Sequence, residues 1–250
     1  MKNKLITVIT VVRNGEDVLE KTIQSIISQT CRNFEYIIID GMSNDRTIDI
    51  IKKYDYAIDR WISESDFGPY DAMNKGINLA NGRWINFMNC GDEFSSADVL
   101  SKIFNSKKLS NFDVIYGNHK IMYPHMKKKN VKPGNLNNLW QGSKFCHQAS
   151  FTSASILKHR MFNLQFCLAS DFHLFYNVWM GGAKFKYLDF CVASISSGGI
   201  SDKKRMQVLW EWLLIVEKSP KTYLYYFIEA LSQISRLIIK SLTRFTYFNY

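Results

Sequence analysis

The sequence LITVITVVRNG at residues 5–15 decides the fold. Its first eight residues are apolar or β-branched and do not alternate with charged residues, which is typical of a strand covered on both faces of a parallel sheet. Asn14-Gly15 then ends the strand. A second run of this kind, FEYIIID at residues 34–40, follows a segment whose apolar residues recur at helical spacing. Strand, helix and strand in this order predict the start of a parallel α/β sheet.

The same alternation continues to about residue 92. We expect further strands over residues 57–62 and 84–88, and helices over residues 17–28, 47–54 and 70–80. This order predicts a doubly wound, mostly parallel sheet, in which ligands bind in the crevice at the carboxyl ends of the strands. After about residue 110 the pattern loosens into mixed strands and loops.

The composition indicates a folded globular protein whose charges are segregated. The net charge is +10, but residues 1–100 carry 11 Lys/Arg and 15 Asp/Glu (−4), and residues 101–250 carry 21 and 7 (+14). A nucleic-acid binder would present one continuous basic face, so this division argues against nucleic acid as a partner. With 250 residues and 46% hydrophobic residues, the chain can bury a substantial core.

The cysteines and the apolar segments indicate the cellular compartment in which we expect the protein. Five scattered cysteines without a CxxC pair disfavour both a disulfide framework and a zinc site. The charged and apolar start lacks a small-residue cleavage site, and no run of about 18 uncharged apolar residues occurs. We therefore expect a cytoplasmic protein without a spanning helix.

Acidic and amide side chains follow two of the predicted strands. Asp40 ends the strand at residues 34–40, where its carboxylate can accept hydrogen bonds from a ligand or simply end the strand. Asn89-Cys90-Gly91-Asp92-Glu93 follows the strand at residues 84–88 and suits a divalent cation that completes its shell from phosphate and water. Because acidic turns are common, this string alone favours a plain turn.

Six segments stand in a fixed order along the chain. They are TVITVVRNG (7–15), EYIIIDGMSNDRT (35–47), WISESDFGPYDAMNKGINLANGRWINFMNCGD (61–92), CHQASF (146–151), LASDFHLF (168–175) and SGGIS (197–201). Together they resemble the inverting glycosyltransferases of family 2, which have the GT-A fold, and they are similar to bacterial members that build surface polysaccharides such as capsule and lipopolysaccharide. The resemblance spans residues 5–201, about four fifths of the chain.

The resemblance implies a metal-dependent enzyme. It would move a hexosyl or N-acetylhexosaminyl group from a nucleotide-sugar donor, a UDP-sugar by expectation, to a hydroxyl of a lipid-linked or growing polysaccharide. Mn²⁺ or Mg²⁺ would be the cofactor. Residues 1–110 would be the nucleotide-sugar-binding half, residues 111–202 the half with the acceptor and the catalytic base, and residues 203–250 a helical extension.

The resemblance also assigns roles to individual residues. Asp171 matches the catalytic base, and Asp92 matches the last acid of the metal-binding DxD. The matching donor-binding residues are Thr10, Val12, Asn14, Asp40, Asp71, Asn74, Lys75, Asn89 and Gly91. Candidate contacts to the metal or the acceptor are Glu93, His147, Gln148, Gly198 and Gly199.

Inversion explains why one base and one cation suffice. The base takes the proton of the acceptor hydroxyl as that hydroxyl attacks the anomeric carbon, and the cation stabilises the charge of the departing diphosphate. A second carboxylate, as in a glycosidase, is unnecessary.

Structural roles remain open for several of these residues. Local sequence alone would make Asp171 the N-cap of a helix, His147 a structural histidine and Gly198-Gly199 a tight turn. Asn89-Cys90-Gly91-Asp92 also lacks one or two acids of the commoner DxD form, so that a cation would bind appreciably only with the nucleotide. The alternative function is a nucleotide-sugar-binding protein without catalysis.

Residues 203–250 form a distinct basic and apolar region. Apolar stripes predict two helices separated by Pro220, with eight Lys/Arg residues between the stripes and an aromatic tail at residues 245–250. These helices could pack on the core, form a homo-oligomer or bind peripherally to the anionic inner face of the cell membrane. The aromatic residues and flanking cations favour the membrane.

Overall fold

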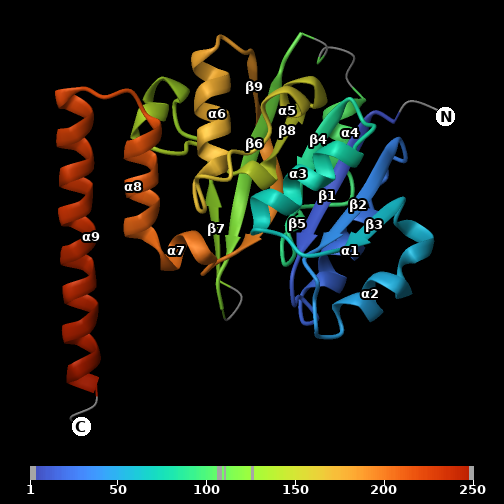
Figure 1. The fold of residues 1–250 in the computed structure, drawn as a ribbon, viewed down its shortest axis with the longest axis horizontal. Coiled ribbons are helices and arrows are strands. Elements are labelled where there is room, and N and C mark those ends of the chain that lie inside the picture. The colour runs from blue at the N-terminus through green and yellow to red at the C-terminus, as the bar shows by residue number, and fades with distance from the viewer. Residues whose placement is uncertain (1–3, 106–108, 110, 125–126, 248–250) are drawn as a thin grey trace.

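The computed structural model describes residues 4–105, 109, 111–124 and 127–247, and only the backbone of residues 240–247 (Figure 1). The strands are β1 (Ile6–Val12), β2 (Phe34–Asp40), β3 (Arg60–Ser63), β4 (Trp84–Phe87), β5 (Glu93–Phe94), β6 (Val114–Met122), β7 (Lys128–Val131), β8 (Ser150–Ser153) and β9 (Phe185–Ser196). The helices are α1 (Leu19–Ile27), α2 (Thr47–Lys53), α3 (Pro69–Leu79), α4 (Val99–Phe104), α5 (Ala154–Arg160), α6 (Ser170–Met180), α7 (Ile200–Lys203), α8 (Arg205–Ile215) and α9 (Pro220–Tyr247).

One sheet runs through the molecule in the order β3-β2-β1-β4-β8-β6-β9-β5, and β7 pairs with β6. The strands β3, β2, β1 and β4 are parallel, as the sequence predicts, so their carboxyl ends meet at one edge. β8 is antiparallel to both β4 and β6 and joins the two halves of the chain into a continuous sheet. The outcome is a mixed α/β sheet with helices packed against it (Figure 1).

The apolar runs explain why β1 and β2 occupy the centre. Every residue of β1 is buried, and so is every residue of β2 after Phe34. Two hydrophobic clusters cover the two faces of these strands, with Ile37 and Ile39 in one and Ile38 in the other. Since successive strand residues point to opposite faces, both faces need apolar side chains.

The predicted elements of the first 92 residues are confirmed, with bounds that shift by a few residues. The largest shift is in β3, which begins at Arg60, three residues after the predicted start. The two helices predicted around Pro220 are also present.

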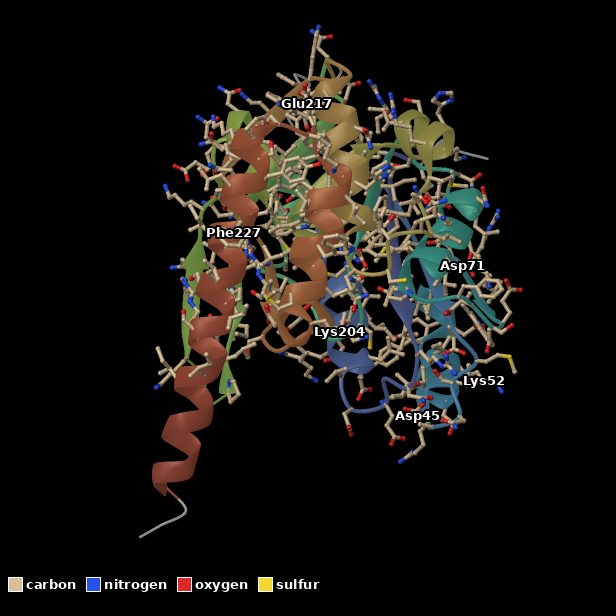
Figure 2. All side chains as sticks on the ribbon, turned by 60° about the vertical axis from the view of Figure 1, so that its left-hand side comes forward. Asp45, Lys52, Asp71, Lys204, Glu217 and Phe227 are labelled. Atoms are coloured by element: carbon tan, nitrogen blue, oxygen red, sulfur yellow. The ribbon has the colours of Figure 1, made fainter. Side chains whose placement is uncertain are left out.

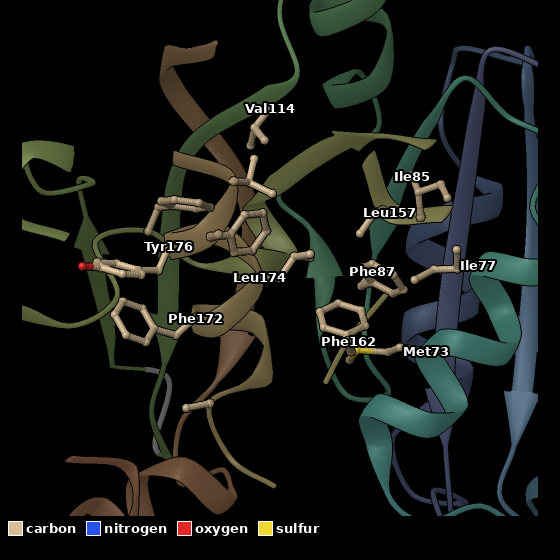
Figure 3. Packing of buried hydrophobic residues seen from close by; sticks show 14 of the residues in the cluster. Met73, Ile77, Ile85, Phe87, Val114, Leu157, Phe162, Phe172, Leu174 and Tyr176 are labelled. Atoms are coloured by element: carbon tan, nitrogen blue, oxygen red, sulfur yellow. The ribbon is translucent and has the colours of Figure 1, made fainter. Parts of the chain in front are cut away.

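α8 packs against α6. The ring of Trp212 on α8 lies 5.4 Å from that of Phe172 on α6, and Leu209 is buried in the same hydrophobic cluster. Gly142 (φ +107°) lies under Trp212, where a Cβ atom would meet the indole at 2.2 Å. Figure 3 shows other members of this cluster, with Phe162 between α3 and the strands next to Met73 and Phe87.

α9 packs against α8 with its first part and then leaves the body of the molecule. Figures 1 and 2 show its second part extending past the sheet without a neighbouring element. Tyr226 fixes the first part, because its hydroxyl donates to the carbonyl of Trp140 at 3.1 Å. Among the described residues, none of the helices is both long and apolar enough to span a bilayer. The side chains of Lys240, Arg244 and the aromatic tail lie outside the described residues.

Candidate active site

The loops after β1 and β2 interlock at the carboxyl edge of the sheet. Asn14, with φ +52°, accepts a hydrogen bond from the Asn44 N–H at 2.9 Å, and its own N–H donates to the Ser43 hydroxyl at 2.7 Å. Asp40 is fully buried and accepts hydrogen bonds from the Ser43 N–H (3.0 Å) and the Ser63 hydroxyl (2.6 Å). Donor binding by Asn14 and Asp40 stays a prediction, since their contacts are within the protein.

Thr10 and Val12 lie inside β1. The Thr10 hydroxyl donates to the carbonyl of Met88 at 2.8 Å and accepts from Tyr36 at 3.0 Å. The Val12 carbonyl accepts the N–H of Gly41 at 2.8 Å. These bonds connect β1 to β4 and to the loop after β2, so the two residues shape the edge on which a donor would rest.

Asp71 and Lys75 on α3 hold the loop that precedes that helix. Asp71 accepts the N–H of Phe67 at 3.1 Å. Lys75 Nζ donates to the carbonyl of Ser65 at 2.6 Å and pairs with Glu64 at 2.9 Å. Lys75 Nζ also lies 3.8 Å from Asp71 Oδ2, and donor binding by Asp71 and Lys75 stays a prediction.

Asn74 makes a different connection. Its amide donates to the carbonyl of Phe162 at 2.9 Å and accepts the N–H of the same residue at 2.8 Å. The side-chain nitrogen and oxygen of Asn74 are therefore both hydrogen-bonded to the backbone of Phe162, in the segment that leads towards α6. The predicted role in donor binding is untested, and the contacts give Asn74 a positioning role.

Asp92 lies at the turn after β4 and is nearly buried, with 7% of its surface exposed. Its carboxylate accepts hydrogen bonds from Gln148 Nε2 at 2.8 Å and from the Ser196 N–H at 3.0 Å. Burial raises the pKa of Asp92, and these two hydrogen bonds only partly offset that effect. The turn is fixed to α1, because the N–H of Gly91 donates to the Thr22 hydroxyl at 2.9 Å. Glu93 pairs with Lys21.

His147 joins the Asp92 turn to Asp171. Its Nε2 lies 3.1 Å from Asn89 Nδ2, and its Nδ1 lies 3.1 Å from Asp171 Oδ2. Because an amide nitrogen only donates, Nε2 must accept and Nδ1 must carry the proton that bonds the carboxylate.

Asp171 lies in the first turn of α6 with its side chain 21% exposed. Oδ1 also contacts the Tyr70 hydroxyl at 2.9 Å. The N-cap of α6 is Ala169, so the alternative role of Asp171 as a capping residue is not what its contacts show. Burial by itself would raise the pKa of Asp171, but the hydrogen bond from His147, followed by the hydrogen bond from Tyr70, brings the pKa below its usual value. The carboxylate is ionised at neutral pH and can accept a proton.

Oxygen ligands for a hard cation are present but few. Within the described part of the chain, no three His, Cys, Asp or Glu side chains gather in one place. Asn89 Oδ1 is buried without a hydrogen-bond partner among the described residues, and Asn89 belongs to the same turn as Asp92. Carboxylate and amide oxygens suit Mg²⁺ or Mn²⁺, and each oxygen of Asp92 keeps acceptor capacity. The residues fit a cation that takes its other ligands from a diphosphate and water.

The family model described as glycosyl transferase family 2 matches residues 7–161. The chain belongs to this family. A PGL/p-HBAD biosynthesis glycosyltransferase of Mycobacterium bovis (strain BCG / Pasteur 1173P2) is 30% identical over 200 residues, which cover 76% of each chain. An uncharacterized glycosyltransferase of Haemophilus influenzae is 32% identical over 122 residues, 48% of each chain.

Solved structures of glycosyltransferases share the GT-A fold. The crystal structure of S. aureus TarS 1-349 in complex with UDP has a TM-score of 0.65 at 16% identity and covers 91% of this chain and 70% of that one. A Pyrobaculum calidifontis mannosyltransferase in complex with GDP-Man and Mn²⁺ has a TM-score of 0.66 at 16% identity, covering 90% and 68%. These likenesses establish the fold of this glycosyltransferase.

The structure brings together the predicted residues Asn89, Asp92, His147, Gln148 and Asp171. Two members of this glycosyltransferase site were not predicted. Tyr70 stands 101 residues before Asp171, and Ser196 stands 104 residues after Asp92, so only the tertiary fold joins them. Tyr70 lies within the motif at residues 61–92 and Ser196 directly precedes the motif at residues 197–201, which is the signal that could have found them.

Gly198 and Gly199 lie in an open loop after β9. Gly198 has φ +81°, which favours glycine, and a Cβ at either position would meet nothing within 4 Å. These facts agree with a tight turn. Contact with an acceptor or a diphosphate stays a prediction for both residues.

Proposed function

We propose that this glycosyltransferase moves a sugar, hexosyl or N-acetylhexosaminyl, from a UDP-sugar to a hydroxyl of a lipid-linked or growing polysaccharide, with inversion. One observation carries the proposal. Asp171 is ionised and its side chain is 21% exposed, and His147 and Gln148 connect that base to the Asp92 turn. A base and a cation-binding carboxylate are thus held by two adjacent residues.

Asp171 is the proposed general base. Each of its oxygens carries one hydrogen bond, from Tyr70 or His147, and keeps capacity for another acceptor bond. The acceptor hydroxyl would donate to one of these oxygens and transfer its proton there while its own oxygen bonds the anomeric carbon. The bond from that carbon to the nucleoside diphosphate breaks on the opposite face. Tyr70 and His147 fix the direction of the carboxylate throughout.

Asp92 and Asn89 are the proposed protein ligands of Mn²⁺ or Mg²⁺. When bound, the cation would neutralise charge on the leaving diphosphate. Gln148 and the Ser196 N–H orient the Asp92 carboxylate, and Asn89 keeps its unpartnered oxygen in the same turn. The solved complexes of TarS with UDP and UDP-GlcNAc and of the mannosyltransferase with GDP-Man and Mn²⁺ support a nucleotide-sugar donor of this class.

The test is a thermal-shift screen with UDP, UDP-GlcNAc and GDP-mannose, each with and without Mn²⁺. Because a ligand that binds the folded state raises the melting temperature, we expect a larger rise with UDP-GlcNAc than with GDP-mannose, and only when Mn²⁺ is present. Asp92→Asn should abolish the part of the rise in melting temperature that depends on Mn²⁺. A Mn²⁺-independent shift without turnover of either sugar nucleotide would favour the alternative, a nucleotide-sugar-binding protein.

The acceptor would reach the site from an anionic membrane surface, in a protein located in the cytoplasm at the inner face of the membrane. α8 and α9 enclose an apolar groove of about 550 Å³, lined by residues that include Trp210, Leu213, Tyr223 and Phe227. Residues 203–250 contain eight Lys/Arg and three Asp/Glu, so an anionic surface complements this region. Attachment here would keep a lipid-linked acceptor near the enzyme.

A further inference from the structure

A buried carboxylate on α8 contacts the backbone that leads into α6. Glu211 is 7% exposed, and its Oε2 accepts the N–H groups of Leu168 and Ala169, both at 2.9 Å. Its Oε1 lies 3.5 Å from Gln207 on the same helix. Burying a charged group is costly unless hydrogen bonds compensate, so a carboxylate in this place has a specific task.

The two N–H groups belong to the start of the helix that carries Asp171. Ala169 is the N-cap of α6, and no side chain of the cap residue bonds the first turn. The N–H groups at a helix start lack partners within the helix, and an anion there is stabilised by the helix dipole. Glu211 supplies this anion from an element 40 residues further along the chain.

Other contacts fix the same segment from the opposite side. The Tyr70 hydroxyl lies within hydrogen-bond distance of the Leu168 carbonyl (3.2 Å) as well as Asp171. Asn74 binds both backbone groups of Phe162, and the Ser170 hydroxyl donates to the carbonyl of Asn163 at 2.9 Å. Residues 162–171 are thus held by α3 on one side and by α8 on the other.

We propose that Glu211 is a positioning residue for Asp171. It fixes the peptide groups two and three residues before the base, so the direction from which Asp171 projects depends on α8. The proposal rests on the proposed function for the role of Asp171. It also makes α8 a part of the catalytic unit, in contrast to a helix that serves only attachment.

The test compares three variants of the full chain. Glu211→Ala removes both hydrogen bonds, and Glu211→Gln keeps an oxygen that can accept them. Leu209→Ala removes buried packing from α8 but leaves residues 168 and 169 untouched, so it controls for loss of stability. The readouts are urea unfolding, hydrogen exchange of the amides at residues 168–172, and hydrolysis of UDP-GlcNAc to UDP and GlcNAc with Mn²⁺, in which water takes the place of the acceptor hydroxyl.

For Glu211→Ala we expect exchange protection to fall from Leu168 through Asp171, and kcat to fall about 10- to 100-fold with an unchanged KM for the donor. Glu211→Gln should recover most of the exchange protection and most of kcat. Leu209→Ala should lower the free energy of unfolding without this combined loss of local protection and kcat. Retained protection at Asp171 in Glu211→Ala, or equal loss of kcat in Leu209→Ala, would overturn the inference. If the wild type turns over no sugar nucleotide, the proposed function fails, and exchange at residues 168–172 still decides whether Glu211 holds the segment.

Discussion

At the scale of single residues, the site depends on how one carboxylate is kept ionised. Asp171 is surrounded by protein, yet its pKa lies below the usual value because His147 and Tyr70 donate hydrogen bonds to the charged form. Tyr70 itself cannot ionise near neutrality, since burial and then the charge of Asp171 raise its pKa well above the usual value. Tyr70 is therefore a permanent donor to the base.

Tyr70→Phe tests this role through the pH dependence of turnover. Without the hydroxyl, the pKa of Asp171 rises, because one of the hydrogen bonds that lowers it is gone. A base must be unprotonated, so the acidic limb of the kcat profile should move to higher pH. The measurement is kcat against pH for UDP release from UDP-GlcNAc. A limb that stays in place, or moves to lower pH, would contradict the assignment.

The sequence predicts some of these residues and cannot predict others. Asp92 and Asp171 stand within motifs of the family, so the resemblance finds them. Glu211 stands in a helix with an apolar stripe, where a single acid is normally solvated, and nothing local indicates that it is buried. Its partners are 42 and 43 residues away, and only the packing of α8 on α6 brings them together.

At the scale of the elements, another buried carboxylate ties the parallel strands together. Glu35 at the start of β2 is 4% exposed and accepts hydrogen bonds from the Thr7 hydroxyl of β1 (2.5 Å) and the N–H groups of Asn81 and Gly82 before β4. It thus links the three central strands at the edge opposite the site. Burial by itself would raise its pKa, but these hydrogen bonds hold the pKa of Glu35 below 4.5.

Glu35→Gln should destabilise the fold by about 1–3 kcal/mol at pH 7, because a neutral amide oxygen accepts the three bonds on Oε1 more weakly than a carboxylate does, and the amide nitrogen would face the Asn81 side-chain amide. The direction in which pH changes the free energy of unfolding follows from the lowered pKa of Glu35. The wild-type carboxylate stabilises the folded state above pH 4.5, and this contribution is lost as the pH falls through the lower pKa of the folded state. Urea unfolding at pH 7 and at acidic pH measures both effects, and the difference between wild type and Glu35→Gln should shrink in acid.

Asp49→Asn is the matched control, because Asp49 is an exposed acid of α2. We expect it to change the free energy of unfolding by less than about 0.5 kcal/mol at either pH. An equal effect of the two substitutions would show that Glu35 has no special role.

The elements of the first half could be predicted because each has one clear period. β1 and β2 are continuous apolar runs, and α1 and α3 have one apolar face, so their bounds fall within a few residues of the prediction. The second half could not be predicted in this detail. β8 has four residues, and β9 mixes exposed and buried positions and pairs with β6 through shifts in register. Such pairing depends on distant partners.

At the scale of the whole molecule, α9 presents an exposed apolar surface that we expect to bind a partner. α9 exposes large apolar side chains, among them Phe227 at 62%, which Figure 2 labels, and Leu231, Ile234 and Leu237. A hydrophobic patch of this extent on a protein surface marks an interaction site. The basic charge of residues 203–250 makes an anionic bilayer the partner that we expect.

The triple substitution Phe227→Ser, Leu231→Ser and Ile234→Ser should abolish binding to vesicles of phosphatidylcholine and phosphatidylglycerol, because the apolar face supplies the binding free energy. Co-flotation with the vesicles measures this. Gln233→Ser is the control on the polar side and should bind like the wild type. Undiminished flotation of the triple variant would contradict membrane binding, and a wild-type dimer that the triple substitution dissociates would assign this face to a second copy of the chain.

The most direct test of the central claim is UDP release by Asp171→Asn. An amide cannot take the acceptor proton, so kcat should fall about 10²- to 10⁴-fold, while the Kd for UDP with Mn²⁺, measured by calorimetry, stays within twofold of the wild type. The hydrogen bonds of Asp171 run to Tyr70 and His147, whereas Asp92 is oriented by Gln148 and Ser196, which is why nucleotide binding should persist. Turnover by Asp171→Asn at the wild-type rate would contradict the account.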